Sequence, residues 1–321
     1  MKLAAVVTAL ILSSGCNAAA TPAPSASAAS AAASSSATLG TPSPGHLGAR
    51  LIVLADGIGG GVGLWALDAQ SHWVALGATP AATALGRATT GVVIATGHLV
   101  EVRPISDLVH TGRVTTLKWP GTSPTAPVEG LDTSPSGKLA VVTADGGGLA
   151  YAVAGVDGTV ATIRPAPTQS FSPLVAWLDD SRLVVLDTDR FQASRLGVVD
   201  TSVHSISTAE ALAGVRVFAL SSDRQMIAVA TERAAYVGPV ETFLGGTLPG
   251  ATITLGDSEV TWALALDATG SRLFLLSGAM ASDGRISSIR EVGYSRQDSG
   301  WAKVLDLPAP FQRAIGQVYL D

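Results

Sequence analysis

From Gly48 to the C-terminus, short apolar runs alternate with turns rich in Gly, Asp, Ser and Pro. No segment keeps apolar residues at i, i+3, i+4 and i+7 for more than about two helical turns, which excludes long amphipathic helices. Short apolar runs bounded by turn residues are typical of β-strands. The pattern therefore predicts an all-β domain over residues 48–321.

A polar turn followed by an apolar strand recurs along this domain at a nearly constant interval. The first aligned apolar residues of four copies are 44, 44 and 46 positions apart: Leu139, Leu183, Ile227 and Leu273. The same interval, counted backwards, reaches the runs that begin at Gly91 and Gly48, so six copies fill the domain. A repeat of about 44 residues with four short strands is the unit of a β-propeller.

The two ends of the domain complete one repeat. The later copies are preceded by a further strand that ends in Leu and a turn residue, as in Leu266-Asp267, whereas the first copy begins directly with its turn at Gly48. The chain ends in a strand with the same ending, Leu320-Asp321. We therefore predict a six-bladed β-propeller closed by its C-terminal strand, an arrangement that protects the sheet edges.

Two glycine-rich stretches, ADGIGGGVG at 55–63 and ADGGG at 144–148, raise the question of a phosphate-binding loop. Their spacing does not fit G-x-G-x-x-G, and strands follow them where a dinucleotide-binding fingerprint opens a helix. Asp-Gly supplies the positive φ that tight hairpin turns need. We expect both stretches to be hairpins.

The N-terminus has the composition of a secretory signal. Met1-Lys2 carries one positive charge, and the apolar run from Leu3 to Leu12 is too short for a bilayer, which needs about 20 residues. Ser13-Ser14-Gly15-Cys16 resembles the lipobox of bacterial lipoproteins, which implies cleavage after residue 15 and acylation of Cys16, for example with palmitate. The alternatives are a secreted protein with an incidental cysteine and an uncut anchor; Cys16 is the only cysteine.

Residues 16–47 predict a tether. After the cysteine this segment consists almost entirely of Ala, Ser, Thr, Pro and Gly and contains no Asp, Glu, Lys or Arg. Such a composition buries too little apolar area to offset the entropy of ordering, so we expect disorder. The expected organisation is a signal peptide at 1–15, a lipidated cysteine and linker at 16–47, and the propeller at 48–321.

Composition narrows the function classes. Charged residues make up 14%, against about 25% in an average domain, and the net charge is −5 with no basic cluster, which argues against nucleic acid as a partner. The sequence has no G-x-S-x-G nucleophile motif and no cysteine in the domain. The histidines are not spaced as transition-metal ligands: His46, His72, His98, His110 and His204.

One turn and strand carry a family resemblance. The stretch 134–142, SPSGKLAVV, is similar to the SPDG-K-apolar turn and strand of bacterial YVTN and tryptophan-aspartate-repeat-like (WD40-like) propellers, including the periplasmic propeller of the Tol system. The resemblance is sharp in one blade and looser in three. It implies the propeller fold in the envelope and leaves activity open, because one fold hosts many functions.

Acidic residues recur at one position of the repeat, the turn after the second strand of each blade. If these turns meet on one rim, their carboxylates could hold Ca²⁺ or a cationic ligand. The alternative is that Asp favours hairpin turns through local hydrogen bonds to the backbone. The candidate ligand rim is Asp56, Asp145, Asp187, Asp189, Glu232 and Asp283.

Two aromatic residues also share a repeat position. Trp177 and Tyr319 stand where the other blades are expected to have small residues: Gly130, Ala219 and Ala265. Large side chains opposite small ones fill a tapered propeller core. Stacking against a ligand is the second interpretation of this pair.

Three functions fit these observations. We favour a monomeric binding module, lipid-anchored by Cys16 on the extracytoplasmic side of the cell membrane, for an envelope protein, peptide or glycan. The alternative is a Ca²⁺-dependent, lactonase-like or other hydrolytic propeller, which would need convergent acidic turns. A structural subunit of an envelope complex is the third, and it would expose an apolar patch. Apart from Ca²⁺ in the second case, no cofactor is expected.

Overall fold

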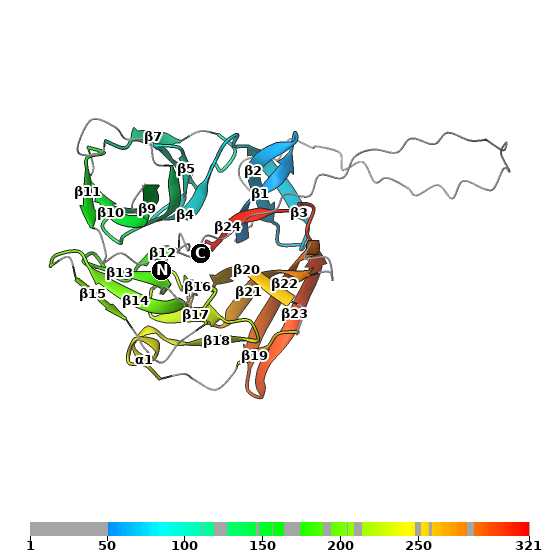
Figure 1. Cartoon of the computed structure of the whole chain (residues 1–321). Coiled ribbons are helices and arrows are strands. Elements are labelled where there is room, and N and C mark those ends of the chain that lie inside the picture. Colours follow the sequence, from blue (N-terminus) through cyan, green and yellow to red (C-terminus); the bar gives the residue numbers. More distant parts are fainter. Residues whose placement is uncertain are drawn as a thin grey trace, which may run out of the picture. The chain divides into compact units, whose positions relative to one another are not determined.

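The strands form six four-stranded antiparallel sheets, and Figure 1 shows these sheets as blades around a centre. The computed structural model describes residues 51–110, 112–118, 127–145, 148–155, 157–163, 174–188, 194–203, 205–208, 214–247, 252–256, 259–280 and 286–320. The predicted signal peptide, Cys16 and the linker lie outside these residues. The prediction of a six-bladed propeller is confirmed.

The blades are numbered along the chain, and each contains four strands, ordered from the inner to the outer strand. Blade 1 contains β24 (Ala314–Tyr319), β1 (Leu51–Ile58), β2 (Gly61–Leu67) and β3 (Trp73–Ala78). Blade 2 contains β4 (Ala84–Ala88), β5 (Gly91–Thr96), β6 (Leu99–Pro104) and β7 (Arg113–Thr116). Blade 3 contains β8 (Val128–Thr133), β9 (Leu139–Asp145), β10 (Gly148–Ala154) and β11 (Val160–Ile163). Blade 4 contains β12 (Val175–Trp177), β13 (Arg182–Thr188), β14 (Ser194–Asp200) and β15 (Ser205–Thr208). Blade 5 contains β16 (Val217–Leu220), β17 (Met226–Ala230), β18 (Ala234–Pro239) and β19 (Ile253–Thr254). Blade 6 contains β20 (Glu259–Leu266), β21 (Arg272–Met280), β22 (Ile286–Gln297) and β23 (Gly300–Pro308). A short helix, α1 (Val240–Leu244), follows β18.

The C-terminal strand closes the ring as predicted. β24 pairs antiparallel with β1, and Leu51 lies opposite Tyr319. The loop before β24 is also fixed to β1, because Asp56 Oδ1 accepts hydrogen bonds from the backbone N–H groups of Gln312 (2.8 Å) and Arg313 (3.0 Å). The two ends of the domain therefore join within blade 1.

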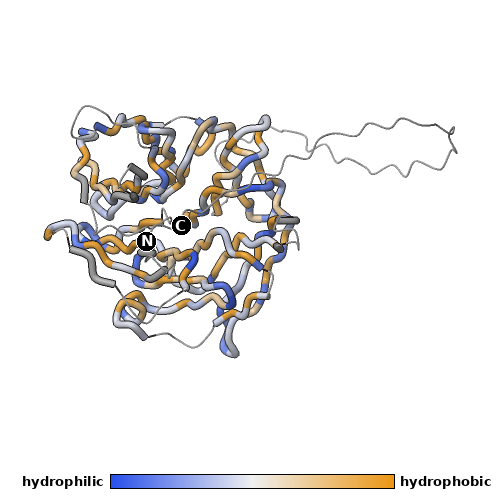
Figure 2. The backbone as a smooth tube through the Cα atoms, in the orientation of Figure 1, coloured by the Kyte–Doolittle hydropathy of each residue, from blue (hydrophilic) through white to orange (hydrophobic). Residues whose placement is uncertain are grey.

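Both faces of the second strands are buried, which explains their unbroken apolar runs. In β1, all five residues of the segment 51–55 are 0–2% exposed. Successive side chains of a strand point to opposite faces, so Ile52 packs in one cluster with Val92 of blade 2, whereas Val53 packs with Leu276 of blade 6. Strands of every blade carry hydrophobic residues (Figure 2), and the core is thus a series of contacts between neighbouring blades.

Inner strands of adjacent blades approach closely at glycine, which has no side chain. A Cβ placed on Gly86 of β4 would lie 2.1 Å from the carbonyl oxygen of Leu131 in β8. No side chain fits at that distance. Gly86 is therefore required for the contact between blades 2 and 3.

The predicted hairpins are confirmed, with one correction to their geometry. β1 and β2 are joined through Gly59 and Gly60, whose φ values of 61° and 81° suit a tight hairpin turn. Asp56-Gly57, which we expected at the turn, lies instead within β1 at a β-bulge, where Gly57 has a φ of 107°. Asp145 and Gly148 are opposite each other across the second hairpin.

Strand pairing also corrects the alignment of the inner strands. Tyr319 pairs with Leu51 and Trp177 pairs with Leu183, so the two aromatic residues do share a repeat position. The residues of the other blades at that position are not the small residues that we expected, because the strand-to-strand turns differ in length. They are Arg87, Thr133, Leu220 and Leu266.

Candidate functional site

The inner strands of all six blades surround a central cavity of about 140 Å³. Most of its wall is small or apolar, from residues such as Ala84, Leu131, Ala176, Ala219 and Ala265. Polar side chains among the lining residues are few: Arg87, Glu129, Asp132, Gln317 and Tyr319. Ligand-binding sites are usually mostly apolar cavities with a few polar groups that orient the ligand.

The inner strands run in the same direction, so their starts gather at one end of the cavity and their ends at the other. The Thr83 hydroxyl, just before β4, donates to the carbonyl of Val128 at the start of β8. The Thr133 hydroxyl at the end of β8 donates to the carbonyl of Arg87 near the end of β4, at 2.8 Å. We call the end with the strand starts the mouth and the end with the strand ends the floor.

Three β-bulges surround the mouth. In β8, β20 and β24, the pairing skips one residue each, namely Glu129, Trp262 and Ile315. These residues occupy the same repeat position, because each lies four residues before Thr133, Leu266 or Tyr319. All three line the cavity. A bulge redirects a side chain and ends regular pairing, and bulges are enriched beside binding and active sites.

Trp262 is the exposed aromatic residue at the mouth. Its side chain is 37% exposed, whereas most large apolar side chains of the inner strands are buried. Glu129 and Ile315 are half-buried beside the same cavity. The mouth therefore presents an indole, a carboxylate and an aliphatic side chain on rigid strands.

Two arginines cross the floor. Arg87 reaches from blade 2 towards blade 5, where its Nη1 lies 3.5 Å from the carbonyl oxygen of Leu220. Arg224, in the turn after β16, donates from Nη1 to the carbonyl of Trp177 (2.7 Å) and from Nη2 to the carbonyl of Thr133 (2.6 Å). Four blades are thus linked at the floor of the cavity.

Asp132 interacts electrostatically with both arginines. Its Oδ2 accepts a hydrogen bond from the backbone N–H of Trp177 at 2.8 Å, and the residue is buried. Burial raises the pKa of the Asp132 carboxyl above its ordinary value, although the positive charges of Arg87 and Arg224 act in the opposite direction. With Asp132 ionised, these three side chains carry a net positive charge.

Of the predicted acidic rim, the two residues whose side chains the structure describes, Asp56 and Glu232, do not line the cavity. Asp56 binds the loop before β24, and Glu232 forms an ion pair with Arg216 beside the β17–β18 turn. Asp145 is the last residue of β9 and Asp187 lies in β13, whereas Asp189 and Asp283 fall outside the described residues. Within the described ranges, no group of three or more His, Cys, Asp and Glu side chains is arranged to hold a metal ion.

The two predicted aromatic contacts differ in their surroundings. Trp177 is fully buried among residues of blades 3 and 4, including Tyr151 and Leu183. Tyr319 lines the cavity but is also buried, with its ring stacked on Phe274 at a centroid distance of 5.5 Å. Both side chains fill space between blades, as the packing interpretation expects.

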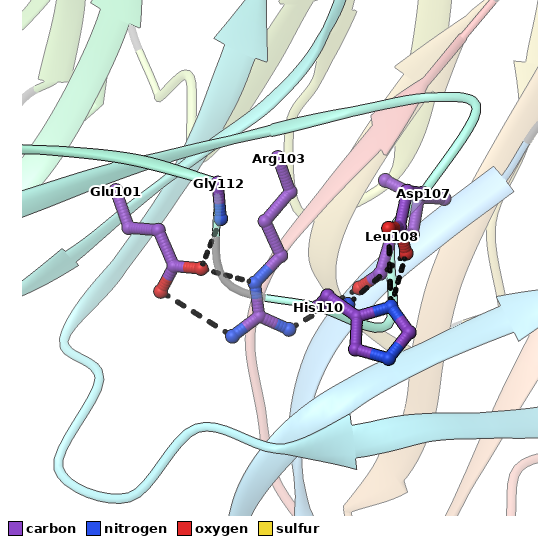
Figure 3. Close-up of polar contacts among 6 residues, drawn as sticks. All are labelled: Glu101, Arg103, Asp107, Leu108, His110 and Gly112. Carbon is purple, nitrogen blue, oxygen red and sulfur yellow. Dashed lines mark hydrogen bonds and ion pairs between the residues drawn. The ribbon is translucent and has the colours of Figure 1, made fainter.

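A second polar cluster stabilises the loop after β6 (Figure 3). Arg103 is buried; its Nε lies 2.7 Å from Glu101 Oε1 and its Nη1 donates to the carbonyl of Leu108 at 3.2 Å. His110 Nδ1 lies 2.9 Å from Asp107 Oδ1, and this contact lowers the pKa of the Asp107 carboxyl. These contacts fix the conformation of the loop and account for the cluster without a ligand.

The residues at both ends of the cavity were not predicted from the sequence. Trp262, Glu129 and Ile315 have no shared chemistry, so their common position is visible only once the bulges are known. Once strand pairing is known, Arg87 is the one charged residue at the position of Thr133, Trp177, Leu220, Leu266 and Tyr319.

In the described part of the chain, no helix is long and apolar enough to cross a membrane. No protein-family model matches the sequence, and no curated protein matches it either.

Solved structures similar to this chain are propellers with low sequence identity. TolB from Acinetobacter baumannii has a TM-score of 0.58 and 11% identity, with coverage of 86% of this chain and 67% of that one. A putative TolB from Agrobacterium tumefaciens has a TM-score of 0.54 and 13% identity, with coverage of 84% and 93%. The periplasmic gluconolactonase PpgL of Pseudomonas aeruginosa has a TM-score of 0.48 and 15% identity, with coverage of 80% and 82%. At 11–13% identity, the two TolB likenesses show the fold alone.

Proposed function

We propose that this chain is a lipid-anchored, extracytoplasmic propeller that binds an envelope protein, peptide or glycan through the mouth of its central cavity. The lipobox-like segment ending at Cys16 supports the anchor, and the uncharged linker supports a domain held away from the membrane. The main support for a binding site at the mouth is the set of three equivalent bulges whose residues line the cavity there.

The size of the cavity favours a ligand that inserts only in part. Sites that enclose a drug-sized molecule measure about 300–1,000 Å³, whereas this cavity measures about 140 Å³. A side chain or chain end of a larger partner fits that volume, and the rest of the partner would contact the rim. The exposed indole of Trp262 is the kind of aromatic side chain that often dominates a binding interface.

Photo-cross-linking tests this proposal. p-Benzoyl-phenylalanine is placed at position 262 of the full chain in cells, and a matched variant carries it at position 203, where Val203 is 68% exposed in the turn between β14 and β15. We expect a discrete cross-linked envelope component from position 262 and none from position 203. Equal cross-linking from both positions, or none from 262, would contradict the proposal.

The Ca²⁺-dependent hydrolytic alternative makes a different prediction. A hydrolytic propeller of this kind requires the acidic turns to bind Ca²⁺. Added Ca²⁺ should therefore raise the melting temperature of the protein, and a chelator should reverse this rise. Asp145→Ala or Asp187→Ala should abolish the rise. The binding module requires no such shift.

A further inference from the structure

Arg87 is a charged residue at a position that packing does not explain. The equivalent residues of the other blades are Thr133, Trp177, Leu220, Leu266 and Tyr319, none of which carries a charge. Four of those five are large apolar or aromatic side chains in the contacts between blades. A guanidinium at the floor therefore needs an explanation other than filling space.

The donors of Arg87 are largely unused within the protein. Its single hydrogen bond, from Nη1 to the Leu220 carbonyl, is long at 3.5 Å, and Nε and Nη2 have no acceptor among the described residues. Four arginines of the described residues form ion pairs with carboxylates, among them the buried Arg103 with Glu101. For Arg87, no carboxylate of the described residues lies within ion-pair distance.

Arg224 is different, because its guanidinium is occupied by two short hydrogen bonds to backbone carbonyls. Its charge also interacts with Asp132, Asp179 and Asp180, and with Arg87, which it repels. An anion beside Arg87 would relieve that repulsion. Arg224 thus closes the floor, and Arg87 remains the cation available to a ligand.

We propose that the cavity binds a ligand with one carboxylate on a short apolar body, and that this carboxylate pairs with the free edge of the Arg87 guanidinium. The planar Nε–Nη2 edge matches a carboxylate in bidentate geometry. The Ala and Leu side chains of the cavity wall would contact the apolar body.

This inference deepens the proposed function and rests on it. The carboxylate can come from a free small acid or from the C-terminal residue of a peptide, because both present the same group on an apolar body. Either source would enter at the mouth, where Trp262 is exposed, and its carboxylate would be recognised at the floor by Arg87.

Isothermal titration calorimetry of the full chain in dodecyl maltoside tests the inference, with 4-methylpentanoate and its uncharged amide as probes. We expect the acid to bind and the amide to bind at least tenfold more weakly, since hydrogen bonds to a charged group are the stronger ones. Arg87→Gln should weaken binding of the acid by a similar factor. Arg233→Gln, which removes an exposed arginine, should have no effect.

Arg87→Lys keeps the charge but removes the bidentate edge, so we expect an intermediate affinity and an unchanged melting temperature. N-acetyl-Ala-Ala-Leu with a free C-terminus serves as the second probe. If this peptide binds more tightly than 4-methylpentanoate, the natural carboxylate belongs to the C-terminus of a peptide. If it binds more weakly, the natural ligand is a free small acid. Equal binding of acid and amide, unchanged binding in Arg87→Gln, or no binding of either acid would overturn the inference.

The two proposals can fail separately. If cross-linking from position 262 succeeds but is unaffected by Arg87→Gln, the carboxylate inference fails and the binding module stands. If the acid binds at Arg87 but position 262 captures no partner, the carboxylate site stands and the proposed envelope partner fails.

Discussion

Glu291 is a fully buried carboxyl at the contact between the last blade and the first. Its Oε1 accepts a hydrogen bond from Gln317 Nε2 of β24 at 2.9 Å. Its Oε2 has no hydrogen-bond partner among the described residues, and neither has Gln317 Oε1. Replacing Glu291 with Gln removes the ionisable group from this contact and keeps nearly the same shape.

The effect on stability follows from the pKa of this carboxyl. Burial raises the pKa of Glu291 from 4.5 to about 8, and the hydrogen bond from Gln317 opposes that rise. Between these two pH values the unfolded chain has lost the proton and the folded chain retains it, so folding stability falls as pH rises. At about 1.4 kcal/mol per pH unit, the loss reaches about 3 kcal/mol at pH 7 and levels off above pH 8.

Urea unfolding between pH 4 and 9 measures this loss. We expect Glu291→Gln and the wild type to have similar free energies of unfolding near pH 4, and the variant to be more stable by about 3 kcal/mol at pH 7. Glu241→Gln, at an exposed position of α1, is the matched control and should show no such pH-dependent difference. A difference between Glu291→Gln and wild type that does not change with pH would refute the reasoning.

Three further predictions concern the anchor and the contacts between blades. Cys16→Ser should move the protein from the membrane to the soluble fraction after centrifugation; continued membrane association would count against lipidation. Gly86→Ala should lower the free energy of unfolding by about 3 kcal/mol, because a Cβ there meets the Leu131 carbonyl at 2.1 Å; an unchanged urea midpoint would show that β4 and β8 can separate at little cost. Asp56→Ala should cost about 1–2 kcal/mol in the same assay, independently of Ca²⁺, because two backbone N–H groups lose their acceptor; a cost that appears only with Ca²⁺ would instead indicate a metal site.

The repeat was predictable because its cause is local. Each second strand is buried on both faces, so its apolar run is continuous and is repeated where the next blade begins, as at Leu183 and Ile227. The first repeat lacks its inner strand and the chain ends in one additional strand, and this local pattern predicted that the C-terminal strand closes the ring. These patterns depend only on burial and turn chemistry.

The cavity was not predictable from the same patterns, because it depends on register. A turn that differs in length by one or two residues changes which inner-strand residue faces the centre, and our alignment therefore compared Trp177 with Ala219 instead of Leu220. The bulge that exposes Trp262 inserts one unpaired residue without any marker such as glycine. The position of Arg87 at the floor becomes evident only when strand partners are known.

The most direct test of the central claim, that this propeller binds at the mouth of its cavity, is amide hydrogen exchange. The lipidated full chain in envelope vesicles is compared with the full chain purified in dodecyl maltoside. We predict slower exchange in vesicles for the segments that enter the inner strands at the mouth, 127–130, 259–263 and 309–315, with no change at the perimeter turn 201–203. Protection confined to the perimeter, or equal exchange in both samples, would contradict the account.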